Sequence, residues 1–168
     1  MSDHLSSGRL EIDVAVFGAE NRVSLVGQID ERTQLDDLAK KLDRVVVMDL
    51  EKVSFINSVG VREWIRMLRS LEERGVELRM KRCSEAMVHQ MNMIVEAKGR
   101  AQVESFFAPY LCEDCGYEGS MCLDVAESLP LFRKMDAPTL PCPECNGTME
   151  FNEIPERYFL FLEDALGD

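Results

Sequence analysis

Two pairs of cysteines with C-x2-C spacing constrain the fold of this chain more than any other feature. Cys112 and Cys115 form the first pair, Cys142 and Cys145 form the second, and 26 residues separate the two. A C-x2-C turn lets two thiolates converge on one metal ion, and two such turns complete a tetrahedron. We therefore predict one structural Zn²⁺ per chain, held by these four residues in a small β-rich zinc ribbon.

Other chemistries can use the same spacing. A redox C-x2-C needs a low-pKa thiol at a helix N-terminus, and no convincing helical pattern follows either pair. Iron also accepts four thiolates, whereas a catalytic zinc would need an open ligand position. Cys122 can in principle replace one of the four ligands. However, Cys122 lies alone in an apolar stretch and Cys83 stands at the end of a predicted strand, so both are interpreted as buried thiols.

The charge of the chain divides near residue 100. The formal net charge is -1 over residues 1–100 and -11 over residues 101–168. This asymmetry predicts two domains, an α/β domain at residues 1–100 and an acidic zinc-ribbon domain at residues 101–168. Because acidic surfaces repel phosphate backbones, no direct contact with nucleic acid is expected.

Hydropathy points to a soluble protein. The longest apolar runs, at residues 45–48 and 158–162, are far too short to span a membrane, and the N-terminus has no basic, then apolar, leader pattern. Six cysteines are too few for a disulfide scaffold in a chain of 168 residues, which fits a reducing compartment. We expect a cytoplasmic location and no membrane insertion.

Apolar periodicity in the first part alternates between the strand and the helix repeat. The predicted order is a strand hairpin at 10–16 and 23–26, a helix at 31–42, a strand at 45–50, a helix from 61 to the stop at Gly75, a strand at 76–81, a helix capped by Ser84 and a strand at 103–111. This order predicts an α/β fold, a mixed sheet with right-handed crossovers. No low-complexity linker follows it, so the ribbon is expected to pack tightly on the first domain and brace it.

The segment at residues 45–61, which contains Asn57-Ser58-Val59-Gly60, resembles the signature of STAS domains, the fold of bacterial anti-sigma factor antagonists. Gly27-Gln-Ile-Asp30 fits the end of the second strand of that family, and the resemblance covers roughly residues 8–98. The usual motif is Asp-Ser-x-Gly, so Asn57 stands where relatives have aspartate. In that family the matching serine, here Ser58, is phosphorylated by a partner kinase that is also an anti-sigma factor.

Ser58 is also a plausible switch on physical grounds. It stands where a strand and loop meet a helix N-terminus, whose free N–H groups and positive dipole end favour a phosphate. Arg62 follows four residues later on the same helix face and can pair with a phosphate or with an acidic partner. The plain structural alternative is that Ser58 is an N-cap, worth about 1 kcal/mol.

Three arginines, Arg62, Arg66 and Arg69, form a stripe on the polar face of this helix. The stripe is either a solvated face or part of a partner surface. The two histidines do not join a catalytic constellation, because His4 is expected in a flexible tail and His89 on a helix. There is also no phosphate-binding glycine loop and no paired acid, so an enzyme is not predicted.

The resemblance implies a signalling protein in a bacterial partner-switching circuit, whose partner is an anti-sigma factor or a related serine kinase. Asn57, Ser58 and the arginine stripe are the expected contact residues. One alternative is a transcription-machinery or nucleic-acid-associated factor in which the zinc ribbon is the active part. Another is a scaffold subunit of a larger assembly.

Overall fold

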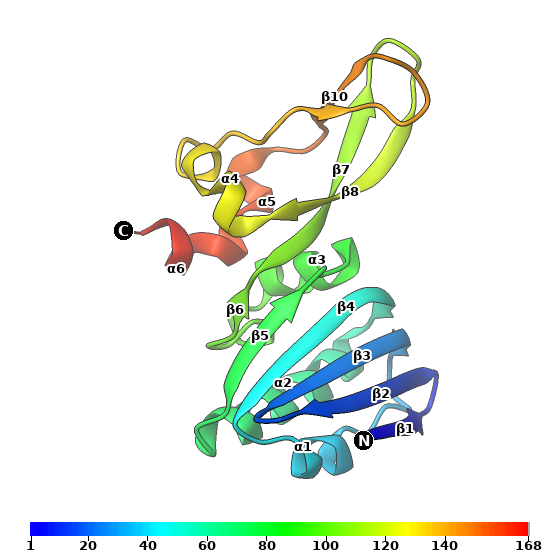
Figure 1. Ribbon diagram of the computed structural model, residues 1–168, viewed down its shortest axis with the longest axis vertical. Helices are drawn as coiled ribbons and strands as arrows, with labels where there is room; N and C mark the ends of the chain where they lie inside the picture. Colours follow the sequence, from blue (N-terminus) through cyan, green and yellow to red (C-terminus); the bar gives the residue numbers. More distant parts are fainter. Residues whose placement is uncertain (168) are drawn as a thin grey trace.

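A computed structural model describes residues 1–167 of the chain. The first part is a six-stranded mixed sheet in the order β1-β2-β3-β4-β5-β6, in which β1, β2 and β3 are antiparallel and β3 to β6 are parallel (Figure 1). The strands are β1 (Ser2–Ser7), β2 (Leu10–Phe17), β3 (Glu20–Ile29), β4 (Val45–Ile56), β5 (Glu77–Lys81) and β6 (Gln102–Val103). The predicted α/β fold with a mixed sheet is therefore confirmed.

Helices connect the parallel strands of this sheet. They are α1 (Asp36–Lys41), α2 (Ser58–Glu73), α3 (Glu85–Met93) and the short 3₁₀ turn η1 (Val95–Ala97). In β2 the residues alternate, with Leu10, Ile12 and Val14 buried and Glu11 and Asp13 exposed. This period of two places one face of the sheet against the helices and leaves the other face to solvent.

The connection after β3 differs from the prediction. A helix was expected at 31–42, but α1 is shorter because Asp30 starts a hydrogen-bonded turn. The Asp30 carboxylate accepts from the N–H of Arg32 at 2.9 Å, and the Asp30 carbonyl accepts from the N–H of Thr33 at 3.0 Å. A buried carboxylate that accepts backbone N–H groups competes with helix formation.

The N-terminus was also predicted incorrectly. His4 lies in β1 and not in a flexible tail, and its ring contacts Asp13 on β2 at 2.8 Å. The pKa of His4 is raised, mainly by this hydrogen bond to Asp13, although desolvation opposes the shift. The polar residues of β1 gave no apolar alternation from which an edge strand could be predicted.

The second part is a four-stranded antiparallel sheet in the order β8-β7-β10-β9, with short helices beside it (Figure 1). The strands are β7 (Ser105–Cys112), β8 (Glu118–Asp124), β9 (Leu140–Pro141) and β10 (Thr148–Phe151). The helices are α4 (Val125–Phe132), α5 (Pro155–Tyr158), the 3₁₀ turn η2 (Leu160–Leu162) and α6 (Glu163–Leu166). The β-rich second part agrees with the predicted fold class, although α4 was not predicted.

The two parts share one hydrophobic core. The single strand predicted at 103–111 is split, because β6 completes the first sheet and β7, after Glu104, starts the second. Phe106 is fully buried, and its ring lies 5.0 Å from that of Phe161 and 5.7 Å from that of Phe132. The domain boundary at residue 100 stays a prediction. Strand β6 lies after that boundary in the sequence but pairs with β5 of the first sheet.

Candidate metal centre and switch site

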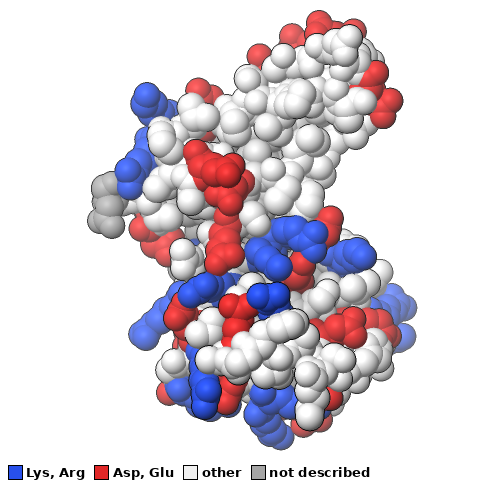
Figure 2. Space-filling model, viewed as in Figure 1, with Lys and Arg blue, Asp and Glu red and all other residues white. Residues whose placement is uncertain are grey.

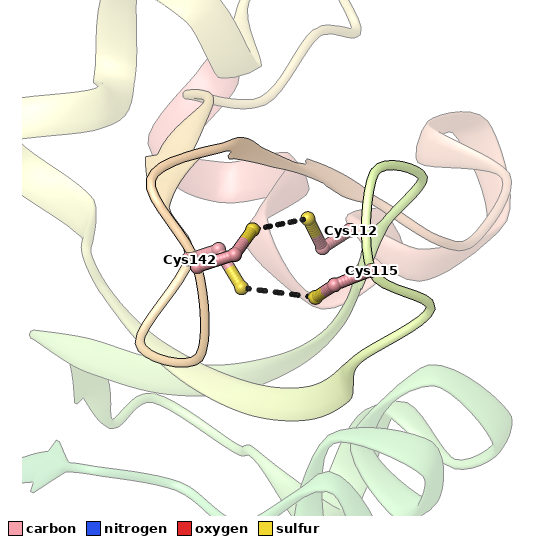
Figure 3. A group of neighbouring side chains, drawn as sticks. Cys112, Cys115 and Cys142 are labelled. Atoms are coloured by element: carbon pink, nitrogen blue, oxygen red, sulfur yellow. Dashed lines mark hydrogen bonds between the residues drawn. The ribbon is translucent and has the colours of Figure 1, made fainter.

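The four predicted metal ligands come together at one end of the second sheet. Cys112 ends β7, Cys115 lies in the turn before β8, and Cys142 and Cys145 lie in the loop between β9 and β10. Their Sγ atoms all lie within 4.8 Å of one another (Figure 3). The β7–β8 turn and the β9–β10 loop therefore contribute two thiol groups each.

The spacing of the sulfurs fits a tetrahedral metal ion. The Sγ atoms of Cys112 and Cys145 are 3.6 Å apart, and those of Cys115 and Cys142 are 3.7 Å apart. A zinc ion with four Zn–S bonds of about 2.3 Å requires sulfurs about 3.8 Å apart. The four cysteines can therefore bind a metal ion, and four thiolates would leave no ligand position open for a reacting water.

Backbone N–H groups support the sulfurs. Glu144 donates to Cys142 Sγ at 3.4 Å, and Gly147 donates to Cys145 Sγ at 3.2 Å. Burial opposes ionisation of Cys142, but the N–H groups of Glu144 and Cys145 and the neighbouring thiols together lower its pKa to about 7. Such donors stabilise the thiolate form that a metal binds.

The remaining two cysteines lie outside this group. Cys83 is fully buried as predicted, and burial raises its pKa. Cys122 was predicted to be buried, but it is exposed on β8, opposite Phe107 of β7. Side chains alternate along β8, so Leu123 points inward and is buried while Cys122 points outward. Cys122 is not among the four clustered thiols.

The cysteine loops do not brace the first sheet directly. Figure 1 shows them at the end of the long axis opposite β1, beyond the length of β7 and β8. The two parts contact each other through β7, which lies against α3 and β5, and through α5 and η2, which pack on α3. At the second contact the Asn92 side chain donates to the carbonyl of Tyr158 at 2.9 Å and accepts from the N–H of Phe161 at 2.8 Å. The cysteine loops are therefore remote from the contact between α3 and the α5–η2 segment.

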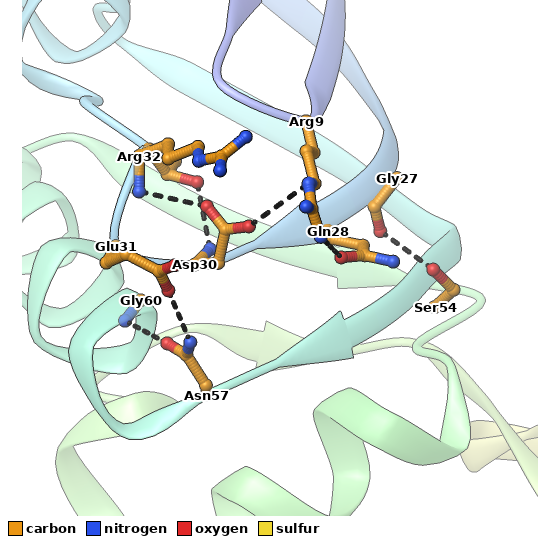
Figure 4. Close-up of polar contacts among 10 residues, drawn as sticks. Arg9, Gly27, Gln28, Asp30, Glu31, Arg32, Ser54, Asn57 and Gly60 are labelled. Carbon is orange, nitrogen blue, oxygen red and sulfur yellow. Dashed lines mark hydrogen bonds and ion pairs between the residues drawn. The ribbon is translucent and has the colours of Figure 1, made fainter.

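The second candidate site lies where β3 and β4 end and α2 begins (Figure 4). Asn57 is the N-cap of α2, because its Oδ1 accepts from the N–H of Gly60 at 2.8 Å. Its Nδ2 donates to Glu31 at 2.9 Å. The interpretation of Ser58 as the N-cap is therefore wrong: Ser58 is the first helical residue and is exposed.

Gly60 explains why the motif needs a glycine. A Cβ atom at this position would lie 2.0 Å from the carbonyl oxygen of Ile29 and 2.9 Å from the amide nitrogen of Asp30. The first turn of α2 therefore packs directly against the backbone at the end of β3. This close approach fixes the position of Ser58 relative to the sheet.

The three arginines of the stripe differ in their contacts. Arg66 forms ion pairs with Glu63 at 3.1 Å and with Asp36 at 3.7 Å. Arg62 and Arg69 are exposed and form no ion pair within residues 1–167. Two of the three guanidinium groups are therefore available to a partner.

Two apolar residues beside Ser58 escaped prediction. Phe55 near the end of β4 is 47% exposed, and Val59 in the first turn of α2 is 49% exposed. Val53 and Ile56 in the same strand are buried, so Phe55 breaks the alternation that Val53 begins. The pairing of β4 with β3 shifts register between Val53 and Phe55, and residue spacing gave no signal of this shift.

The mixed sheet and its crossover helices define an α/β domain with an exposed turn at the start of α2. Residues 21–96 match the family model of the STAS domain. A search of curated proteins found no match. STAS domains are protein-interaction modules of partner-switching systems and are typically not enzymes. No helix within residues 1–167 has the length and apolar content needed to cross a membrane.

Proposed function

We propose that this protein is a cytoplasmic signalling adaptor in which the turn from β4 into α2 docks on a protein partner. The partner class that suits a STAS domain is an anti-sigma factor or a related serine kinase. The docking surface comprises Phe55, Asn57, Ser58, Val59 and Arg62, with Arg66 and Arg69 at its margin. It combines exposed apolar side chains with available cations, which is the composition of a protein interface.

The observation that carries this proposal is the free hydroxyl of Ser58. Asn57 caps the helix, so Ser58 has no capping role, and its hydroxyl forms no hydrogen bond within residues 1–167. The N–H groups of Ser58 and Val59 are at the start of the helix and have no intrahelical acceptor. A serine that is exposed, not needed for the fold and set at a positive dipole end supports a role as a phosphate acceptor.

In the proposed switch the partner kinase transfers the γ-phosphoryl group of ATP to Ser58 Oγ. The hydroxyl proton is released, and ADP leaves. The added charge of about -2 can pair with Arg62, but it lies between Phe55 and Val59 in the apolar part of the surface. Desolvating that charge on docking is unfavourable, so phosphorylation would release the partner.

The structural role proposed for the metal is separate. We propose that Cys112, Cys115, Cys142 and Cys145 hold one zinc ion, which would fix the β7–β8 turn and the β9–β10 loop. The acidic surface around them disfavours nucleic acid. Figure 2 shows Lys and Arg side chains gathered mainly over the STAS part, while the second part carries mainly Asp and Glu among uncharged residues.

The test is affinity purification from the native cell with the wild type, Ser58→Ala and Ser58→Asp, followed by mass spectrometry. We expect the alanine variant to retain a kinase-like partner and the aspartate variant to lose most of it. Val59→Glu should lose it as well, while Phe17→Glu, an exposed apolar residue on β2, serves as the matched control. Equal recovery with all variants would refute the docking surface.

A further inference from the structure

A second exposed apolar patch lies where the STAS part meets the C-terminal part. It consists of Met93 at the end of α3, Val95 in η1 and Leu160 in η2, which are 74%, 80% and 52% exposed. A groove of about 330 Å³ lies between Val95 and Leu160, with the buried Met91 and Phe161 among its lining residues. Exposed apolar side chains around such a groove are typical of an interaction site.

The groove is held in shape by contacts on both sides. Asn92 bridges to the backbone of Tyr158 and Phe161 with two hydrogen bonds, and Lys98 forms an ion pair with Asp164. Lys98 is nearly buried, with 9% of its side chain exposed. The exposure of Val95 and Leu160 is therefore not that of a frayed end, and the groove is preformed for a ligand.

The surroundings of the groove indicate the chemistry of its occupant. The groove is walled by α3, η1, η2 and α6, so it offers no free strand edge for an added β-strand. Glu163 and Asp164 are exposed and line the groove, with Asp164 paired to the nearly buried Lys98, and Glu96 is exposed next to Val95 in the sequence. They belong to a molecule whose residues 101–168 carry a net charge of -11. An apolar groove with acidic margins and helical walls fits an amphipathic helix with Lys or Arg along its flanks.

We propose that this groove binds a basic amphipathic helix of a protein partner. The site uses residues from both parts of the chain and is distinct from the surface around Ser58. A membrane surface is disfavoured because the acidic margin would face anionic lipid headgroups. A second copy of the chain is disfavoured because each copy carries a net charge of -12.

The probe for this proposal is a fluorescein-labelled peptide of about 18 residues, built from Leu and Lys with Leu at helical spacing. A scrambled peptide of the same composition, which cannot form an apolar stripe, is the peptide control. Fluorescence anisotropy with the full chain should show saturable binding of the first peptide and at least about tenfold weaker binding of the second.

Val95→Glu and Leu160→Glu separate the groove from general charge attraction. Each adds a negative charge, so simple electrostatics would strengthen binding of a cationic peptide, whereas loss of the apolar contact should weaken it about tenfold or more. Phe17→Glu adds the same charge at an exposed apolar site remote in sequence and should not weaken binding. Glu163→Gln should weaken it about two- to threefold at low salt. Circular dichroism melts would establish that each variant is folded.

Several results would overturn the proposal. These are no binding of the patterned peptide, equal binding of the scrambled peptide, or unchanged affinity in both Val95→Glu and Leu160→Glu. Sedimentation of the wild type with phosphatidylserine vesicles, lost in both groove variants, would assign the patch to a membrane instead. A concentration-dependent dimer lost in the same two variants would assign it to a second copy.

Discussion

The Asn57 side chain donates a hydrogen bond of 2.9 Å to the carboxylate of Glu31 while it caps α2 through Gly60. An aspartate at position 57 would keep the cap, since Asp and Asn are comparable N-caps. It would, however, place a second carboxylate against Glu31 and lose the donor. Glu31 thus gives a physical reason for an asparagine in this chain at the position where the STAS signature usually has aspartate.

This relationship predicts the outcome of a double-variant experiment. Asn57→Asp should lower the midpoint of thermal unfolding at pH 7, and adding Glu31→Gln should restore most of the loss because an amide can donate to the new carboxylate. Differential scanning fluorimetry of the two single variants and the double variant measures the coupling. Additive effects of the two substitutions would contradict it.

The same pair has a defined pH dependence. The pKa of Glu31 lies below its ordinary value of 4.5, first because its own backbone N–H donates to it and then because Asn57 does. A depressed pKa means that the ionised group stabilises the fold above pH 4.5 and that this contribution is lost as the pH falls through the folded-state value. Glu31→Gln should therefore flatten the stability profile in the acid range.

Gly60→Ala should be destabilising although alanine normally favours a helix. The alanine Cβ atom would lie 2.0 Å from the Ile29 carbonyl oxygen, so α2 or the end of β3 must move. We expect a loss of about 1–3 kcal/mol in unfolding free energy, as for other overpacked sites. Val59→Ala, one residue earlier at an exposed position, is the matched control and should change stability little. Urea titrations of both variants measure the change in unfolding free energy. An unchanged or raised stability of Gly60→Ala would exclude the close approach of Gly60 to the Ile29 carbonyl.

Metal binding makes a prediction confined to the second part. We expect about one zinc ion per chain by elemental analysis, lost in Cys142→Ser and retained in Cys122→Ser. Removal of the metal should increase amide hydrogen exchange at residues 112–118 and 141–148 but not in β4, because the cysteine loops lie far from the first sheet. A folded, metal-free preparation with protected loops would refute the structural role.

Phe106 tests whether the two parts unfold together. Its ring is fully buried and packs on Phe132, Phe159 and Phe161. Phe106→Ala should cost about 3–5 kcal/mol. Because the aromatic cluster touches α3 through Tyr158 and Asn92, the wild type should show one calorimetric transition. Two separate transitions in the wild type would show that the parts are independent domains.

Some features of this fold are encoded in local residue spacing, and others depend on distant contacts. The cluster of four cysteines was predictable because C-x2-C spacing brings pairs of thiols together locally, and Ser84 was predictable as the cap of α3 because a cap acts locally. The strand β1 was not, since its six residues pair with β2 without an apolar alternation. The length of α1 was also missed, because a turn held by Asp30 overrode the helical spacing of Leu35, Leu38 and Leu42.

The C-terminal part shows the limits most clearly. Helix α4 contains Pro130, and strands β9 and β10 are only two and four residues long. Neither the helical nor the strand repeat of apolar residues was therefore recognisable in this part of the sequence. The exposed positions of Phe55 and Val59, and the groove between Val95 and Leu160, depend on how distant elements meet. Surface sites of this kind follow from tertiary arrangement and not from local residue spacing.

The central claim, that Ser58 controls docking of a partner, is tested most directly by the modification state of the protein in its own cells. The protein would be recovered in two pools, free and partner-bound, and the fraction phosphorylated at Ser58 measured in each by mass spectrometry of the peptide that contains it. We predict phosphoserine in the free pool and unmodified Ser58 in the bound pool. Unmodified Ser58 in both pools, or equal phosphorylation in both, would contradict the claim.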